Sequence, residues 1–218
     1  MIVAFTGQKG GVGKSTTAIS VAAEFVARGR GVLLVDADPQ GTARTWSELA
    51  AQEGHPTPTV VAMGATMHRP DQLPKVRAGF DAVFIDCPPR AGDVQRAALM
   101  IADVAVVPCG PSAADAWALA GTLELVAEAK ALRPELLAVV LLTRVQGHTA
   151  LGRGAREVLA DSGLPVLRAS LGYRVAYAEA LAAGLGVTTY APRDTAADEV
   201  RALVSELERL TKKGRKHG

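Results

Sequence analysis

The segment Lys9–Thr16 (KGGVGKST) constrains the fold of this chain more than any other feature of its sequence. It follows an apolar run, Ile2–Thr6, that is typical of a buried strand, and it leads into Lys14–Arg28, which has helical periodicity. Its three glycines allow a tight loop to turn its N–H groups inward, and the following helix adds the positive end of its dipole. This context predicts a phosphate-binding loop between the first strand and the first helix.

Short apolar runs alternate with helical segments along the whole chain, a pattern typical of a parallel sheet with helices on both faces. The expected strands are Ile2–Thr6, Gly31–Asp36, Thr59–Met63, Ala82–Asp86, Val104–Pro108, Leu136–Thr143 and Pro165–Leu167. The expected helices are Lys14–Arg28, Thr42–Gln52, Val94–Ile101, Ala113–Leu132, Ala150–Ser162, Arg174–Ala183 and residues 196–210. Gly54–Pro58 and Met67–Pro74 are expected to be surface loops.

The length of 218 residues fits one large α/β domain better than two. We expect a single P-loop NTPase domain over residues 1–211, with a mostly parallel twisted sheet, and a basic, flexible tail over residues 212–218. Hydrophobic residues make up 49% of the chain and aromatic residues only 4%, so the core should consist mainly of Ala, Val, Leu and Ile.

Cysteine content and hydropathy exclude several classes of protein. Cys87 and Cys109 lack the CxxC spacing of metal and redox motifs, and each follows an apolar run, so we expect buried, reduced thiols. No apolar stretch approaches the roughly 18 residues of a membrane span, and the first apolar run is too short for a signal peptide. The net charge of +2 names no partner. We therefore expect a soluble, cytoplasmic protein.

Acidic residues stand at the ends of two predicted strands, where ligands of parallel α/β sheets bind. Asp36 and Asp38 close one of these strands, and Asp86 closes another. Carboxylates at this edge can hold Mg²⁺ beside the Ser15 hydroxyl, while Lys14 supplies a point charge for the outer phosphates. For Asp36 and Asp38, capping of the following turn and helix is the alternative role.

The loop departs from the generic phosphate-loop pattern, because Gln8 stands where that pattern has glycine and Lys9 precedes the double glycine. The string KGGVGKST resembles the deviant Walker A loop of the ParA/MinD superfamily of ATPases. Further segments resemble conserved blocks of small ParA proteins, so the resemblance covers nearly the whole chain: Val32–Gly41, Phe80–Pro89, Ala102–Asp115, and Arg174–Ala180 with Val187–Pro192.

The resemblance implies a Mg-ATP site and slow hydrolysis in an ATP-bound homodimer. The residues expected to bind the nucleotide are Lys9, Gly10, Gly11, Val12, Gly13, Lys14, Ser15 and Thr16 in the loop, with Thr143 and Pro192 near the adenine. Catalysis is expected to use Lys14, Lys9, which reaches the nucleotide of the other subunit, and Asp38, which orients the attacking water. Ser15, Asp38 and Asp86 are expected to hold Mg²⁺. Asp115 is expected to be a cap or an interface residue.

Members of this superfamily differ in the surface to which they attach. ParA-like members bind DNA without sequence preference, whereas MinD-like members lie on the membrane through a C-terminal amphipathic helix. The last predicted helix of this chain carries an apolar stripe that lacks Phe and Trp, and we expect the stripe to pack on the core: Val200, Leu203, Val204, Leu207 and Leu210. The candidate DNA contacts are Arg153, Arg156, Arg168, Arg174, Lys212, Lys213, Arg215 and Lys216.

These features together predict a ParA-like ATPase that segregates or positions a cargo through non-specific DNA binding and an adaptor of the ParB type. One alternative is a MinD-like ATPase associated with the membrane. Another is an enzyme similar to dethiobiotin synthetase that uses ATP on a small molecule. Because the first predicted strand begins at residue 2, we expect no helix-turn-helix module before the loop and no sequence-specific DNA binding.

Overall fold

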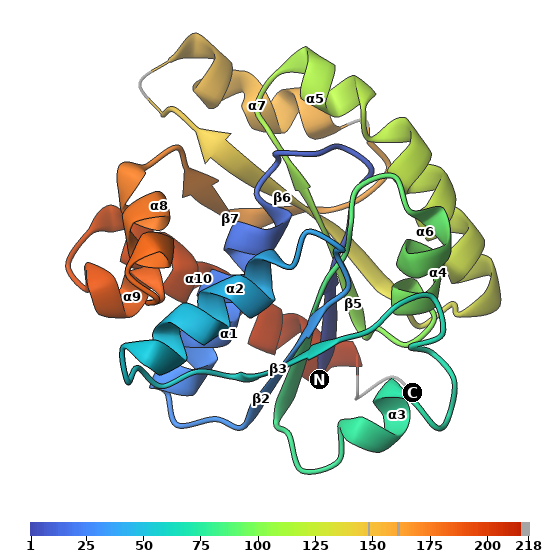
Figure 1. Cartoon of the computed structure of the whole chain (residues 1–218). Coiled ribbons are helices and arrows are strands. Elements are labelled where there is room, and N and C mark those ends of the chain that lie inside the picture. The colour runs from blue at the N-terminus through green and yellow to red at the C-terminus, as the bar shows by residue number, and fades with distance from the viewer. Residues whose placement is uncertain (148, 161, 215–218) are drawn as a thin grey trace.

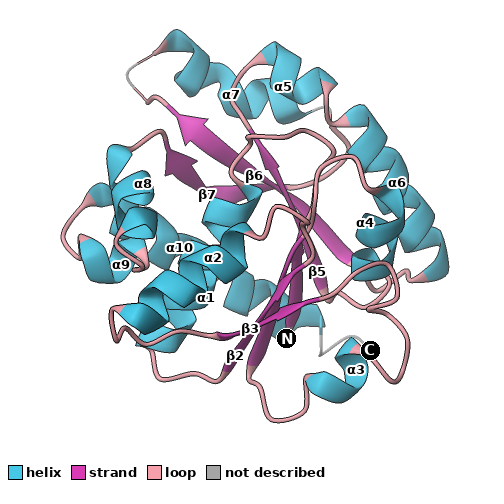
Figure 2. Ribbon diagram, in the orientation of Figure 1, coloured by secondary structure: helices cyan, strands magenta, loops and turns pink. Residues whose placement is uncertain are grey.

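Seven strands form one sheet in which every neighbouring pair runs parallel (Figures 1 and 2). The computed structural model describes residues 1–147, 149–160 and 162–214. The order across the sheet is β3-β2-β4-β1-β5-β6-β7. The strands are β1 (Ile2–Phe5), β2 (Val32–Asp36), β3 (Thr59–Ala62), β4 (Ala82–Asp86), β5 (Val104–Cys109), β6 (Leu137–Val145) and β7 (Val166–Gly172).

Helices cover both faces of this sheet, as the alternation of segments predicts (Figure 2). On one face, the buried core joins the strands to α1 (Lys14–Ala27), α2 (Thr42–Gln52), α8 (Val175–Ala182), α9 (Val187–Tyr190) and α10 (Thr195–Gly214). On the other face lie α3 (Leu73–Val76), α4 (Gly92–Leu99), α5 (Ala113–Trp117), α6 (Ala120–Leu132) and α7 (Ala150–Ala160). The predicted fold class, a single P-loop NTPase domain with a parallel sheet, is confirmed.

The register of the central strands gathers the polar residues at one edge of the sheet. Asp36 at the end of β2 lies beside Asp86 at the end of β4, and Phe5 at the end of β1 lies on the other side of Asp86. These strand residues are buried on both faces, so the chain can turn outward only where the strands end. The loop that follows β1 therefore begins next to Asp86, with Asp36 one strand further along the same edge.

The single helix expected over Ala113–Leu132 is instead two helices, α5 and α6. The break lies where the loop after β1 docks on the helices. Gln8 donates its backbone N–H to the Thr122 hydroxyl at 3.0 Å and its side-chain amide to the Gly121 carbonyl at 3.3 Å. The helical periodicity of the sequence could not predict this break, because the contact joins residues more than 110 positions apart.

Other parts of the chain also differ from the expected elements. Strand β7 runs to Gly172 rather than Leu167, because it is an edge strand whose buried residues, Leu167, Ala169 and Leu171, alternate with less buried ones instead of forming a continuous apolar run. The segment Met67–Pro74, expected to be a surface loop, contributes two fully buried side chains to the core, Met67 and Leu73. Helix α10 continues to Gly214, beyond the helix end expected at residue 210.

The apolar stripe of α10 packs on the core, as expected. Val200, Leu203, Val204 and Leu207 have no exposed surface, and Leu210 packs partly buried against the same core cluster. A stripe that is covered in this way cannot insert into a bilayer unless α10 leaves the domain. In the part of the chain that the structure describes, none of the helices is both long and apolar enough to cross a membrane.

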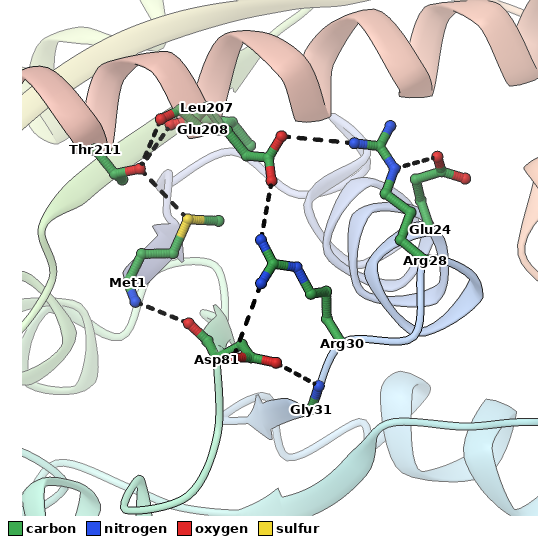
Figure 3. A network of polar contacts seen from close by, with 9 residues as sticks. All are labelled: Met1, Glu24, Arg28, Arg30, Gly31, Asp81, Leu207, Glu208 and Thr211. Carbon is green, nitrogen blue, oxygen red and sulfur yellow. Dashed lines mark hydrogen bonds and ion pairs between the residues drawn. The ribbon is translucent and has the colours of Figure 1, made fainter.

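A polar network fastens α10 to the edge of the sheet opposite the loop (Figure 3). The Glu208 carboxylate lies 3.6 Å from the Arg28 guanidinium at the end of α1 and 3.8 Å from that of Arg30. Arg30 also faces Asp81 at 4.0 Å, and the Asp81 carbonyl accepts a hydrogen bond from the amino group of Met1. Each pair is partly exposed and contributes modestly, so the apolar stripe provides most of the docking energy of α10.

Substitution of Leu207 tests this assignment of the stripe. Leu207→Ala should lower the free energy of unfolding by about 2–5 kcal/mol, because it opens a cavity in the core. Leu132→Ala is the matched control, since Leu132 is 73% exposed and its loss should change stability by less than about 0.5 kcal/mol. Urea denaturation followed by circular dichroism measures both. Equal, small effects would contradict the burial of the stripe.

Candidate functional site

The loop between β1 and α1 adopts a conformation that depends on two of its glycines. Gly11 has φ 71° and Gly13 has φ 89°, both in the left-handed region that side chains with a Cβ rarely occupy. Gly13 is also the N-cap of α1, so the loop ends directly at the positive end of that helix. An anion in the loop therefore meets backbone N–H groups and a helix dipole together, as the sequence pattern predicts.

Lys14 places a cation with little solvent beside this loop. It is only 6% exposed, and its ammonium group donates a hydrogen bond of 2.9 Å to the Lys9 carbonyl. Burial lowers the pKa of Lys14, and the nearby Asp86 carboxylate opposes this effect. A poorly hydrated ammonium group binds an incoming anion strongly, because little water has to be displaced.

Asp86 is the most constrained carboxylate of the site. It has no exposed surface, and neither of its oxygens has a hydrogen-bond partner within the described residues. Burial raises the pKa of Asp86 to about 7, the charges of Asp36 and Asp38 add to this shift, and the Ser15 hydroxyl and Lys14 counteract it. A buried carboxylate without a partner is costly, so the arrangement fits a ligand that supplies positive charge.

Mg²⁺ fits this requirement. It prefers oxygen ligands and is commonly held by one or two carboxylates together with phosphate oxygens and water. The Asp86 carboxylate and the Ser15 hydroxyl are oxygen donors that lie close to each other at this edge. No group of three or more His, Cys, Asp or Glu side chains able to hold a metal occurs within the described ranges, so the remaining ligands would come from a bound phosphate and water.

Asp36 and Asp38 have different surroundings. The Asp36 carboxylate is buried and accepts a hydrogen bond of 2.9 Å from the backbone N–H of Arg44, in the first turn of α2. The Nε atom of the Arg44 guanidinium lies 3.6 Å from the same carboxylate oxygen. Asp36 therefore caps the start of α2, which is the alternative role given above for both acids. Asp38 is half-buried, accepts a hydrogen bond from the Gln40 N–H at 2.9 Å, and lies close enough to Lys14 to influence its pKa.

Lys9 is engaged within its own chain. Its ammonium group contacts the Asp115 carboxylate at 2.7 Å. Asp115 in turn forms a capping box with Ser112 at the start of α5, which agrees with the expected capping role. Because the ion pair is partly exposed and joins residues 106 positions apart, a competing anion can draw Lys9 away without unfolding any element.

A cavity of about 240 Å³ opens from the loop toward β6 and β7. Gly11 and Gly13 form one wall, and apolar side chains such as Leu171 and Leu181 form another. Thr143 lines this cavity, and its hydroxyl donates to the Val12 carbonyl at 2.8 Å. The location and the apolar wall of the cavity suit the sugar and base of a nucleotide whose phosphates occupy the loop.

Pro192, expected near the adenine, is not among the residues that line this cavity. Its carbonyl accepts a hydrogen bond of 2.9 Å from Arg201, which ties the turn between α9 and α10 to α10.

The site also contains side chains that the sequence did not predict. Arg144 and Tyr173 line the cavity, and the buried Gln95 amide bridges the carbonyls of Gly7 and Pro88. Arg144 could have been predicted as a site residue because it directly follows Thr143, which was a candidate.

The expected DNA contacts that the structure describes come from several elements. Arg156 uses its guanidinium to bind the carbonyls of Leu167 and Arg168, while the Arg168 side chain is exposed on the edge strand β7. Arg174, at the far end of β7, pairs with Glu199 at 2.7 Å. Lys212 belongs to α10 and directly follows Thr211, whose hydroxyl contacts the Met1 sulfur. Arg153 and Lys213 belong to α7 and α10, and Arg215 and Lys216 lie outside the described residues.

Known proteins resemble this chain in sequence and fold. A family description, the CobQ/CobB/MinD/ParA nucleotide binding domain, matches residues 3–187. The maintenance of carboxysome distribution protein A of Halothiobacillus neapolitanus is 32% identical, over 91% of this chain and 92% of that protein. The chromosome-partitioning ATPase Soj of Thermus thermophilus is 33% identical, over 94% of both chains. Cobyrinic acid a,c-diamide synthase from Mycobacterium smegmatis, crystallised with ADP and magnesium, superposes with a TM-score of 0.78 at 25% identity, over 99% of this chain and 97% of that one.

The raised pKa of Asp86 predicts how stability depends on pH in the chain without ligands. The protonated acid is favoured in the folded state, so its contribution is complete below pH 4 and is lost as pH rises through about 7. Between pH 4 and 7, the wild-type chain should lose on the order of 2–4 kcal/mol relative to Asp86→Asn, which does not titrate. Urea denaturation at several pH values measures the difference. Parallel pH profiles for the two proteins would show that Asp86 is not desolvated.

Proposed function

The chain belongs to the CobQ/CobB/MinD/ParA nucleotide-binding family, and from this membership we propose that it is a ParA-type ATPase that positions a cargo. It binds Mg-ATP, dimerises around the bound nucleotide and hydrolyses it slowly until a partner protein stimulates the reaction. The observation that carries this proposal is that the desolvated Lys14 ammonium lies near the buried Asp86 carboxylate, whose oxygens have no hydrogen-bond partner among the described residues.

Each residue of the loop has a defined task in this proposal. The N–H groups of the loop and the Lys14 ammonium bind the β- and γ-phosphates, and Ser15 with Asp86 holds Mg²⁺. The metal, when bound, neutralises charge on the phosphate oxygens. Asp38, which is half-buried beside Lys14, orients the attacking water. In phosphoryl transfer, positioning and charge stabilisation of this kind provide most of the catalysis.

Lys9 has the task that connects hydrolysis to dimerisation. We propose that it leaves Asp115 and contacts the phosphates bound by the second subunit. The ion pair with Asp115 is compatible with this exchange, since it is partly exposed and contributes little to the stability of the subunit. A triphosphate presents more negative charge to Lys9 than one carboxylate does, so the exchange favours a dimer that contains ATP.

The attachment surface in this proposal is DNA, reached without sequence preference, and the cargo is connected through an adaptor protein. We place the protein in the cytoplasm, on the nucleoid when ATP is bound. Support comes from the sequence relatives, one of which is a chromosome-partitioning ATPase. The MinD-like alternative loses its main argument, because the apolar stripe of α10 lies in the core. The small-molecule enzyme is a weaker alternative, since three relatives at 32–34% identity are named for chromosome partitioning or carboxysome distribution.

Three alanine variants separate the tasks of the site. Lys14→Ala should bind ATP at least tenfold more weakly, because it removes a charge-assisted contact with the phosphates. Lys9→Ala should bind ATP but fail to dimerise, whereas Asp38→Ala should bind and dimerise but release little phosphate. Calorimetry, light scattering with ATP and a phosphate-release assay measure these steps. If Lys9→Ala and Asp38→Ala behaved alike in all three assays, the division of tasks would be wrong.

DNA binding should depend on ATP and on salt. The logarithm of the binding constant should fall linearly with the logarithm of salt concentration, with a slope of about −0.9 for each phosphate neutralised on duplex DNA. Arg168→Ala should reduce this slope, because its exposed side chain can reach a phosphate. Arg96→Ala is the control, since Arg96 pairs with Glu128 on the α4–α6 side of the domain. Binding to anionic vesicles without any DNA binding would favour the MinD-like alternative.

A further inference from the structure

The ladder of backbone hydrogen bonds between β1 and β4 meets a proline where the two strands end. The N–H of Cys87, directly after β4, donates to the Phe5 carbonyl at 3.1 Å. Such a series advances by two residues on each strand, so its next bond would run from residue 89 to the Gly7 carbonyl. Residue 89 is Pro89, which has no N–H. The Gly7 carbonyl therefore needs a donor from another part of the chain.

The side-chain amide of Gln95 supplies this donor. Gln95 lies in α4 and has no exposed surface. Its amide nitrogen donates to the Pro88 carbonyl at 2.7 Å and to the Gly7 carbonyl at 3.4 Å. Because the amide nitrogen carries two N–H donors, one group can bridge the two chains. The bridge holds the loop after β4 against the start of the glycine loop.

The other half of the amide indicates that stability alone does not explain this residue. The Gln95 Oε1 atom is buried and has no hydrogen-bond partner in the part of the chain that the structure describes. An unpaired buried acceptor costs about as much free energy as one or two hydrogen bonds contribute, so it offsets much of what the two donated bonds add. A buried amide that is only half satisfied is better explained by the groups that it positions.

The bridge connects the two parts of the candidate site. Pro88 comes two residues after Asp86, the candidate metal ligand, and Gly7 comes two residues before Lys9, where the phosphate-binding segment begins. The bridge therefore fixes how the Asp86 carboxylate is placed relative to the glycine loop. Mg²⁺ demands near-ideal octahedral geometry, so its binding is sensitive to the placement of a carboxylate relative to bound phosphates.

We propose that Gln95 is a positioning residue for the metal. It acts through the two loops that it joins, by holding Asp86 where Mg²⁺ can contact both the carboxylate and a phosphate in the glycine loop. Groups one step removed from the ligands of a metal commonly change its affinity by about 10–100-fold. This inference rests on the proposed function, because it assumes that Mg-ATP binds at this edge of the sheet.

The contribution of Mg²⁺ to nucleotide affinity tests this role. Gln95→Met keeps the approximate size of the side chain and removes both donors. It should weaken the binding of the non-hydrolysable analogue AMPPNP about tenfold in the presence of Mg²⁺, and leave its binding in EDTA within about twofold of wild type, because only the metal depends on the bridge. Isothermal calorimetry gives both constants. Circular dichroism checks the fold, and Gln95→Leu repeats the exchange with a second apolar side chain.

Gln52→Met is the matched control, since it makes the same exchange at an exposed glutamine at the end of α2. It should leave both constants unchanged. Asp86→Ala provides a double-mutant cycle: in that background, Gln95→Met should weaken binding with Mg²⁺ by less than about twofold, because Gln95 acts through Asp86.

Two results would overturn the role of Gln95 and leave the proposed function intact. Equal losses with and without Mg²⁺, or losses that add to those of Asp86→Ala, would show that Gln95 supports the loop independently of the metal. Wild-type constants in Gln95→Met would show that the bridge positions nothing. A wild-type chain whose affinity for AMPPNP is not raised by Mg²⁺ would instead contradict the proposed function, on which this inference rests.

Discussion

The desolvated ammonium group of Lys14 is the constraint around which the functional edge of this protein is arranged. Its charge is tolerable because Asp86 lies near it and because the Lys9 carbonyl accepts its hydrogen bond. Asp86, in turn, is held there by the parallel register of β1, β2 and β4, which aligns the ends of these strands. The loop, the two carboxylates and the start of α1 therefore form one electrostatic unit. A phosphate with its metal satisfies charges that the chain alone leaves only partly balanced.

The sequence was sufficient to predict the features that depend on local pattern. The strand–loop–helix context predicted the loop at Lys9–Thr16, and the alternation of segments predicted a parallel sheet. The helical spacing of apolar residues in α10 predicted its buried stripe. These predictions succeeded because backbone geometry repeats at fixed periods and because buried parallel strands must be apolar. The ends of β7 were not predictable in the same way, since an edge strand shows alternation rather than a continuous apolar run.

Contacts between distant segments could not be read from the sequence. The ion pair between Lys9 and Asp115 and the hydrogen bond from Arg144 to Gly11 each join residues more than 100 positions apart. The break between α5 and α6 has the same origin, because the loop after β1 docks there. Pro192 is the converse case: its segment resembles a family block, and the hydrogen bond from Arg201 to its carbonyl cannot be read from that resemblance. Functional geometry depends on such tertiary contacts more than on local propensity.

The network around Glu208 and Asp81 also decides how the protein can be handled in experiments (Figure 3). Met1 and Thr211 are neighbours in it, with the Thr211 hydroxyl 3.6 Å from the Met1 sulfur. Both lie at the edge of the sheet farthest from the glycine loop. An N-terminal fusion would turn the amino group of Met1 into an amide, which can still donate its hydrogen bond to the Asp81 carbonyl. Fluorescent reporters or surface tethers attached at this edge would leave the nucleotide face open, so single molecules could be followed while they bind and release ATP.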